Sequence, residues 1–260
     1  MTAPLALAGV DAALEVAAAQ AADGRRTALV PPRGRPGRCT ADALVALLER
    51  LARHPWARTV DLTLPLVGLL SPLATDVLPG GSGTARADAV VLERARDVAL
   101  VARNAGVQLT VDGGDLPVER TLGLLLELRK DFPDTGVVVR AALRRSEGDC
   151  RGLAHEGSRV RLLPGPRVAR PAGPDGAHRP GLAREAALVR CAAVLLAGDG
   201  EPGVAADDPL VARIAAAVAS REARGVGGWE RVTTLDRRGA PRRAAADDDA
   251  VVRVLVPWRA

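Results

Sequence analysis

Residues 131–167 read DFPDTGVVVRAALRRSEGDCRGLAHEGSRVRLLPGPR, and they carry the clearest local signals for the fold of the whole chain. Within it, residues 136–139 are a β-branched run between turn residues, which predicts a buried strand. Ser146 and the acidic residues after it are typical of a helix start, and Gly157 is typical of a helix end. A second strand is predicted at residues 160–163. A strand, a helix and a strand at this spacing predict a parallel βαβ unit, with ligands at the carboxyl ends of its strands.

The same alternation continues along the chain in both directions. Strands are expected at residues 27–30, 59–64, 107–111, 136–139, 160–163, 203–205, 229–234 and 251–256, and helices at residues 10–22, 40–54, 84–104, 115–129, 146–156, 182–196 and 208–224. Eight strands alternating with helices predict an α/β fold, a (βα)8 TIM-like barrel that lacks its last helix. We expect a single domain over residues 1–260, with an N-terminal helix in residues 1–24 and the barrel in residues 27–257.

Composition narrows the class of protein. With 260 residues and 48% hydrophobic residues, the chain is long enough for a well-filled core. No apolar stretch approaches the roughly 18 residues that a membrane-spanning helix needs, and residues 1–20 lack the basic start and cleavage site of a secretory signal. Cys39, Cys150 and Cys191 form no CxxC pair. These features predict a cytoplasmic protein without structural disulfides.

Charge and aromatic content argue against nucleic-acid binding. The net charge of +5 comes almost entirely from scattered arginines, since Lys130 is the single lysine. Stacking on single-stranded nucleic acid needs an aromatic platform, and the chain has one phenylalanine, three tryptophans and no tyrosine.

Familiar catalytic motifs are missing from the sequence. A doubly wound sheet is the alternative fold, but no Gly-rich fingerprint follows the first strand, and residues 80–83 lack the lysine of a phosphate loop. We interpret residues 72–83 as a connecting loop. His54, His155 and His178 are far apart in sequence and no HExxH is present, so no metal site is predicted. There is also no GxSxG motif of a serine hydrolase.

Several segments carry a family resemblance. They are GVQLTVD (106–112), LRKDFPDTG (128–136), LRR (143–145) with DCR (149–151), GSRVRL (157–162), and more weakly WE (229–230) and VRVLVP (252–257). Together they resemble proline dehydrogenase, in its short, single-function bacterial form. The resemblance implies a distorted (βα)8 barrel that binds FAD at the carboxyl ends of its strands, oxidises L-proline to pyrroline-5-carboxylate and passes electrons to a membrane quinone.

The resemblance also implies site residues. Asp112 matches the acidic residue that ends the third strand near the flavin and substrate, and Arg161 matches the arginine of the fifth strand that faces the flavin. A fixed cation there stabilises the negative charge of the reduced ring. Arg140 is a third candidate for cofactor binding, because it stands at the barrel mouth, where the family has a glutamine. For each residue, an ion pair at a strand end is the structural alternative.

Other positions depart from the family pattern. Asp61 stands where the family has a lysine, and Ala142 and Leu255 each stand where it has a tyrosine. Of a Lys-Gly-Ala-Tyr motif only Gly165 is kept, since Pro164, Pro166 and Arg167 replace its other residues. Ala205 and Ala206 replace a Thr-His pair that helps hold FAD. The last helix, with the paired arginines that clamp the proline carboxylate, is absent from the sequence. Each charged hydrogen bond in such a clamp contributes about 1.5–3 kcal/mol, so proline oxidation by this chain should be very poor.

Three hypotheses follow. The first is a degenerate paralogue with a binding, structural or regulatory role. The second is a working FAD-dependent oxidoreductase that acts on proline or a related amine or imino acid, with peripheral membrane contact if electrons still pass to quinone. The third is an unrelated barrel enzyme. A barrel without its last helix should expose apolar surface, so we also expect a homodimer, a partner, or cover by the N-terminal helix.

Overall fold

The structure is a computed structural model that describes residues 7–31, 39–70, 81–165, 176–236, 239–242 and 250–259. Contacts divide the chain into two compact units. One consists of Met1–Leu5 and Gly136–Leu255, and the other of Ala6–Thr135 and Val256–Ala260. We call them the C-terminal unit and the N-terminal unit, and describe each by itself. The expectation of a single domain stays a prediction.

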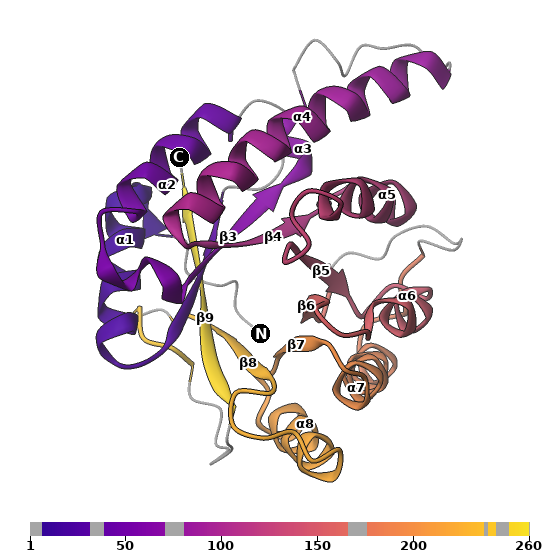
Figure 1. Ribbon diagram of the computed structural model, residues 1–260. Helices are drawn as coiled ribbons and strands as arrows, with labels where there is room; N and C mark the ends of the chain where they lie inside the picture. Colours follow the sequence, from indigo (N-terminus) through magenta and orange to yellow (C-terminus); the bar gives the residue numbers. More distant parts are fainter. Residues whose placement is uncertain are drawn as a thin grey trace. The chain divides into compact units, whose positions relative to one another are not determined.

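The N-terminal unit alternates strands with helices (Figure 1). Its elements are β1 (Leu7–Ala8), α1 (Gly9–Ala22), β2 (Arg26–Val30), α2 (Ala41–Leu51), the 3-10 helix η1 (Pro55–Thr59), β3 (Val60–Pro65), α3 (Leu66–Leu69), α4 (Gly81–Ala105), β4 (Gln108–Asp112) and α5 (Val118–Arg129). β3 pairs in parallel with both β2 and β4. Parallel neighbours joined through helices are the βαβ arrangement that the sequence predicts.

Local sequence explains why α2 forms where it does. Thr40 precedes the helix, and its side-chain oxygen accepts a hydrogen bond from the backbone N–H of Ala43 at 3.3 Å. This is the N-cap predicted for that threonine. The apolar stripe of the helix is buried at Leu44, Leu47, Leu48 and Leu51. Helix α2 packs against α4, so the stripe contributes to the core of this unit.

The C-terminal unit repeats the pattern with shorter connections. Its elements are β5 (Gly136–Arg140), α6 (Ser146–Leu153), β6 (Arg159–Leu163), α7 (Leu182–Ala197), β7 (Glu201–Ala205), α8 (Pro209–Arg221), β8 (Glu230–Thr234) and most of β9 (Val251–Arg259). The strands pair in parallel in the order β5, β6, β7, β8 and β9. The stretch that begins at Asp131 therefore forms the expected β5–α6–β6 unit.

Strands β2 to β9 are the eight predicted strands of a (βα)8 fold, and the described part of the chain has no helix after β9. The predicted fold class is therefore confirmed. Strands β3 and β4 alternate in character. In β3, Val60, Leu62 and Leu64 are buried apolar residues, whereas Asp61 and Thr63 between them are buried and polar. The polar face of the strands is where a site would lie.

Several expected boundaries are wrong. Helices α2, α6 and α8 end at Leu51, Leu153 and Arg221, each three residues before its expected end. Helix α4 begins at Gly81, inside the predicted loop 72–83, while residues 71–80 lie outside the described residues. Strand β9 does not end at Pro257 but continues to Arg259. The physical reason is an unpredicted partner, since Leu7 and Ala8 of β1 pair with Trp258 and Arg259.

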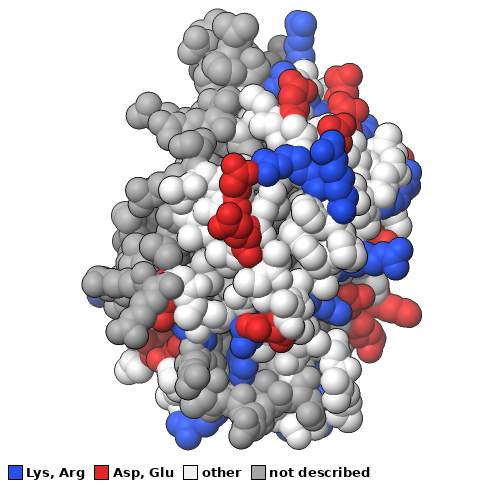
Figure 2. Space-filling view, turned by 90° about the vertical axis from the view of Figure 1, so that its left-hand side faces the viewer, with Lys and Arg blue, Asp and Glu red and all other residues white. Residues whose placement is uncertain are grey.

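Charged side chains of both signs are mixed on the face that Figure 2 presents. In the N-terminal unit, an exposed ion pair joins Arg50 on α2 to Asp11 on α1, with the Nη2 and Oδ1 atoms 2.5 Å apart. Such exposed pairs contribute little to stability. In the residues that the structure describes, no helix has the length and apolar character needed to cross a membrane.

Candidate functional site

In parallel α/β folds, ligands bind at the carboxyl ends of the strands. In the N-terminal unit this edge includes Asp112, the last residue of β4. In the C-terminal unit it includes Arg140, Leu163, Ala205 and Thr234, the last residues of β5 to β8. Asp112 and Arg140 therefore stand at strand ends, as predicted.

Asp112 is 4% exposed and is held by its own turn. Its Oδ1 atom accepts a hydrogen bond from the backbone N–H of Gly114 at 2.9 Å. Between them, Gly113 lies against helix α5, because a Cβ atom built there would be 2.0 Å from Oγ1 of Thr121. The glycines let the chain turn closely against α5, and the turn fixes the carboxylate at the strand end.

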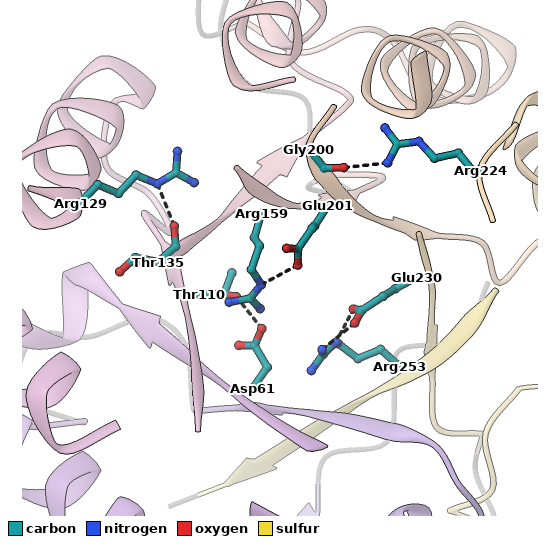
Figure 3. Close-up of polar contacts among 10 residues, drawn as sticks. All are labelled: Asp61, Thr110, Arg129, Thr135, Arg159, Gly200, Glu201, Arg224, Glu230 and Arg253. Atoms are coloured by element: carbon teal, nitrogen blue, oxygen red, sulfur yellow. Dashed lines mark hydrogen bonds and ion pairs between the residues drawn. The ribbon is translucent and has the colours of Figure 1, made fainter. Parts of the chain in front are cut away.

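Asp61 is buried deeper in the same unit. The hydroxyl of Thr110 donates a hydrogen bond to its Oδ2 atom at 2.7 Å, and the two residues are 1% and 2% exposed (Figure 3). Pro65 of β3 pairs with Asp112 of β4, and Asp61 lies four residues before Pro65 on the same strand. At about 3.3 Å per residue, Asp61 lies about 13 Å from that level along the strand. Its hydrogen bond and depth give it a structural role in the β3–β4 pair.

Arg140 and Arg161 come together on adjoining strands of the C-terminal unit. Val138 of β5 is level with Arg161 of β6, and Arg140 is level with Leu163. Side chains two residues apart on a strand share a face, so both arginines project from the same face of the sheet. Arg161 is 5% exposed and Arg140 is half-buried. The two cations form the basic part of the candidate site, with Arg161 about 7 Å below the strand end.

The loops after β5 and β6 pack directly against each other beside these cations. Backbone N–H groups of Ala141 and Ala142 donate to the carbonyl oxygens of Leu163 and Pro164, at 2.8 and 3.0 Å. A Cβ atom built on Gly165 would be 2.7 Å from the Cβ of Ala142, and Gly165 has φ +109°. A side chain at 165 would therefore require the backbone to shift.

Ala177 and His178 also pack against the loop after β5. The backbone N–H of His178 donates to the carbonyl oxygen of Ala142 at 2.7 Å, and Leu143 forms an isolated bridge with Ala177. Backbone, instead of polar side chains, thus fills the edge beside Ala142. Pro166 and Arg167, which the family comparison singled out, lie outside the described residues.

Asp207 is a residue that sequence reasoning missed. Its carboxylate accepts hydrogen bonds from the hydroxyl of Thr233 at 2.8 Å, and from the backbone N–H and hydroxyl of Thr234 at 3.0 and 2.7 Å. It ties the segment after β7 to the carboxyl end of β8. An acidic residue two positions after a predicted strand was the available signal. The neighbouring Ala205 and Ala206 carry methyl groups and no polar side chain.

Ion pairs occupy the opposite, amino-terminal part of the same strands (Figure 3). Arg253 of β9 is 1% exposed, and its Nε and Nη2 atoms donate to the carboxylate of Glu230 at 2.5 and 2.7 Å. Arg159 and Glu201 start β6 and β7, with Nε and Oε2 3.9 Å apart. These ion pairs stabilise the barrel and lie away from the catalytic edge, because catalytic residues of such folds gather at the carboxyl ends of the strands.

The donor set can be tested against FAD, the cofactor implied by the resemblance. Arg161 and Arg140 suit the negative charge of a reduced flavin ring. The positions of the Thr-His pair that the resemblance assigns to FAD do not fit, because Ala205 and Ala206 offer no side-chain donor and the next residue, Asp207, is acidic. Among residues with a described position, no group of three or more His, Cys, Asp or Glu side chains is placed to hold a metal ion.

Comparison with known proteins agrees with the fold. No family model matches the chain, and no curated protein matches its sequence. Solved structures of proline utilization A do match. The protein from Bdellovibrio bacteriovorus, inactivated by N-propargylglycine, has 16% identity and a TM-score of 0.76 over 98% of this chain. Those from Corynebacterium freiburgense and Bradyrhizobium japonicum have 16% and 17% identity and TM-scores of 0.72 and 0.69, over 98% and 90%.

The chain has the (βα)8 barrel fold found in part of these proline utilization A proteins. At this level of identity the similarity concerns the fold alone. The chain spans 26% to 30% of the length of these matched proteins. The predicted resemblance to the short, single-function form stays a prediction, as do the site roles of Asp112, Arg140 and Arg161.

Proposed function

We propose that this proline dehydrogenase-like barrel has lost ordinary proline oxidation and has a binding, structural or regulatory role. The observation that carries the proposal is the carboxyl edge after β5 and β6, where Ala142 and Gly165 meet within van der Waals distance. In the family resemblance, this edge presents a tyrosine and a lysine to the substrate. The methyl group of Ala142 and the backbone of Gly165 offer no charged side chain to an amino acid carboxylate, and the backbone N–H of Ala142 already donates to the carbonyl oxygen of Pro164.

The edge after β7, where the resemblance places residues that help hold FAD, supports the same proposal. A flavin dinucleotide carries anionic phosphates, and their binding needs cations or N–H donors. Asp207 is instead an anion whose oxygens accept hydrogen bonds from Thr233 and Thr234. Like charges close together in a site of low polarity repel, so Asp207 opposes a phosphate at this edge.

A flavin spectrum of the purified chain tests the proposal. We expect a preparation without the visible absorption of flavin, no flavin retained after incubation with FAD and desalting, and no dye reduction with L-proline. A yellow protein with stoichiometric FAD that reduces a dye with L-proline would overturn the proposal.

One observation favours a second function. Arg140 and Arg161 project from one sheet face on adjoining strands, which suits an anionic group or a reduced flavin ring. The alternative is therefore an active FAD-dependent oxidoreductase for L-proline or a related amine or imino acid, with electrons passed to quinone. Bound flavin that is bleached by one of these amines would favour this alternative. Arg161→Met should then weaken flavin binding more than the control Arg151→Met, which changes an exposed arginine of α6.

We further propose a cytoplasmic location, which rests on three cysteines that are free thiols.

A homodimer, or a partner that covers apolar surface, also remains a proposal. Exposed apolar side chains on α5, α7 and α8, at Leu126, Leu182 and Leu210, support it. The oligomeric state can be tested by measuring molecular mass across a concentration series. The measurement uses the full chain and a chain that lacks residues 1–23. A truncated chain that stays monomeric and soluble would exclude cover by the N-terminal helix.

A further inference from the structure

Two cysteines meet at the contact between α6 and α7, away from the strand ends. Cys150 lies on α6 and Cys191 on α7, and their residues are 0% and 1% exposed. The two helices pack against each other. The neighbouring turns are joined by an ion pair, since Nε of Arg190 is 3.1 Å from Oε2 of Glu147. Glu147 is three residues before Cys150, so both share one face of α6, and this face meets α7 beside Cys191.

The two thiols lie within hydrogen-bonding reach of each other across this contact. A hydrogen bond donated by Cys150 stabilises a thiolate on Cys191, which lowers the pKa of Cys191. The same bond, together with burial, raises the pKa of Cys150. Carboxylates of Glu147 and Asp149 oppose a thiolate here, whereas the guanidinium of Arg190 favours it. Cys191 is therefore the better nucleophile of the pair.

We propose that Cys150 and Cys191 form an oxidisable dithiol, which hydrogen peroxide converts into an intramolecular disulfide between α6 and α7. The site is independent of the proposed function of the barrel. It is a modification site set by the packing of two helices, and the linkage would fix the segments on either side of β6 to each other.

The reaction balances as two thiols and one peroxide giving one disulfide and two waters. The Cys191 thiolate attacks a peroxide oxygen, the O–O bond breaks, and the departing hydroxide takes the Cys150 proton to form water. Cys191 is then a sulfenic acid. The Cys150 thiolate attacks its sulfur, the S–O bond breaks, and the second hydroxide takes the proton that Cys191 first released. The two sulfurs are oxidised and the peroxide is reduced.

Cys39 provides an internal control. It lies in the N-terminal unit, apart in sequence from the pair, and burial raises the pKa of its thiol to about 11. Since the thiolate is the reactive form, Cys39 should stay reduced while the pair reacts. Both paired thiols are buried, so the oxidant reaches them when the eight-residue helix α6 opens locally.

The experiment treats the full chain with graded hydrogen peroxide, removes the excess with catalase, unfolds the chain and labels the remaining thiols with N-ethylmaleimide. We expect the reduced chain to take three labels and the oxidised chain to take one, at Cys39. A peptide that links Cys150 to Cys191 should disappear on treatment with dithiothreitol. Cys39→Ala should oxidise at the wild-type rate, and Cys150→Ser should form no intramolecular disulfide.

Three outcomes would overturn the proposal. One is retention of all three labels at peroxide doses that convert a small-molecule dithiol completely. Another is a disulfide that includes Cys39 or joins two chains. The third is conversion of Cys191 to a sulfinic acid without linkage to Cys150. None of these depends on a variant that folds, because the wild-type chain supplies the decisive measurement.

Discussion

Replacing Arg253 with methionine tests the buried ion pair of the C-terminal unit. Arg253 is 1% exposed, and the side chain of its partner Glu230 is 18% exposed. The pair is bidentate, with donor–acceptor distances of 2.5 and 2.7 Å. Removing one member leaves the other as an uncompensated charge, which costs about 3–5 kcal/mol for a buried pair. Because Glu230 keeps some contact with solvent, we expect the lower end, about 3 kcal/mol.

The assay is urea unfolding followed by circular dichroism, on matched variants. Arg253→Met should lower the free energy of unfolding by about 3 kcal/mol. Adding Glu230→Gln should recover part of that loss, because the stranded carboxylate is then neutral. The control is Arg221→Met, since Arg221 pairs with Glu222 at the surface with 68% of its side chain exposed, and it should cost less than about 1 kcal/mol. An Arg253→Met chain within about 1 kcal/mol of wild type, or a double variant less stable than the single variant, would show that the pair is not a buried, coupled ion pair.

Three further predictions concern the same unit. Gly165→Ala should destabilise the chain by more than about 1 kcal/mol in urea unfolding, because its φ is +109° and the new Cβ meets Ala142, whereas Gly152→Ala in α6, with open space, should be neutral or stabilising. The Arg190 hydrogen bond lowers the pKa of Glu147 below its ordinary 4.5. The Glu147 carboxylate therefore stabilises the folded chain above pH 4.5, and this stabilisation is lost as pH falls through the lowered pKa. Glu147→Gln should therefore differ from wild type at neutral pH, in low salt, and converge with it in acid; a difference that grows in acid would contradict this. Oxidation of the dithiol should raise the melting temperature, since closing a loop of about 40 residues stabilises by about 4 kcal/mol in the chain-entropy account, and an unchanged or lower value would contradict it.

The strand and helix framework could be predicted because each element carries local signals. Thr40 caps α2 as its sequence position indicates, and the β-branched run in β5 forms the expected buried strand. The extension of β9 could not be predicted, because it depends on pairing with Leu7 and Ala8, some 250 residues earlier. Local sequence has no information about such a distant partner.

The candidate site was predicted less completely than the fold. The strand-end position of Asp112 and the shared face of Arg140 and Arg161 follow from strand periodicity, which sequence contains. Asp207 was missed because its role depends on two hydroxyls and a backbone N–H of β8, which lie 26 and 27 residues later. The ion pair of Glu230 and Arg253 was missed for the same reason, since register between strands decides it.

The contact between Gly165 and Ala142 shows that a glycine which matches a catalytic motif can be required by the backbone alone. Gly165 is the one position of the strand-five motif that this chain shares with the family, and on its own it would suggest a remnant of catalysis. Its backbone, with φ +109° and a neighbouring methyl group 2.7 Å from any added Cβ, requires glycine whether or not a ligand binds. A barrel of this kind would keep such a glycine after losing its chemistry, so its presence identifies the loop geometry and gives no information about turnover.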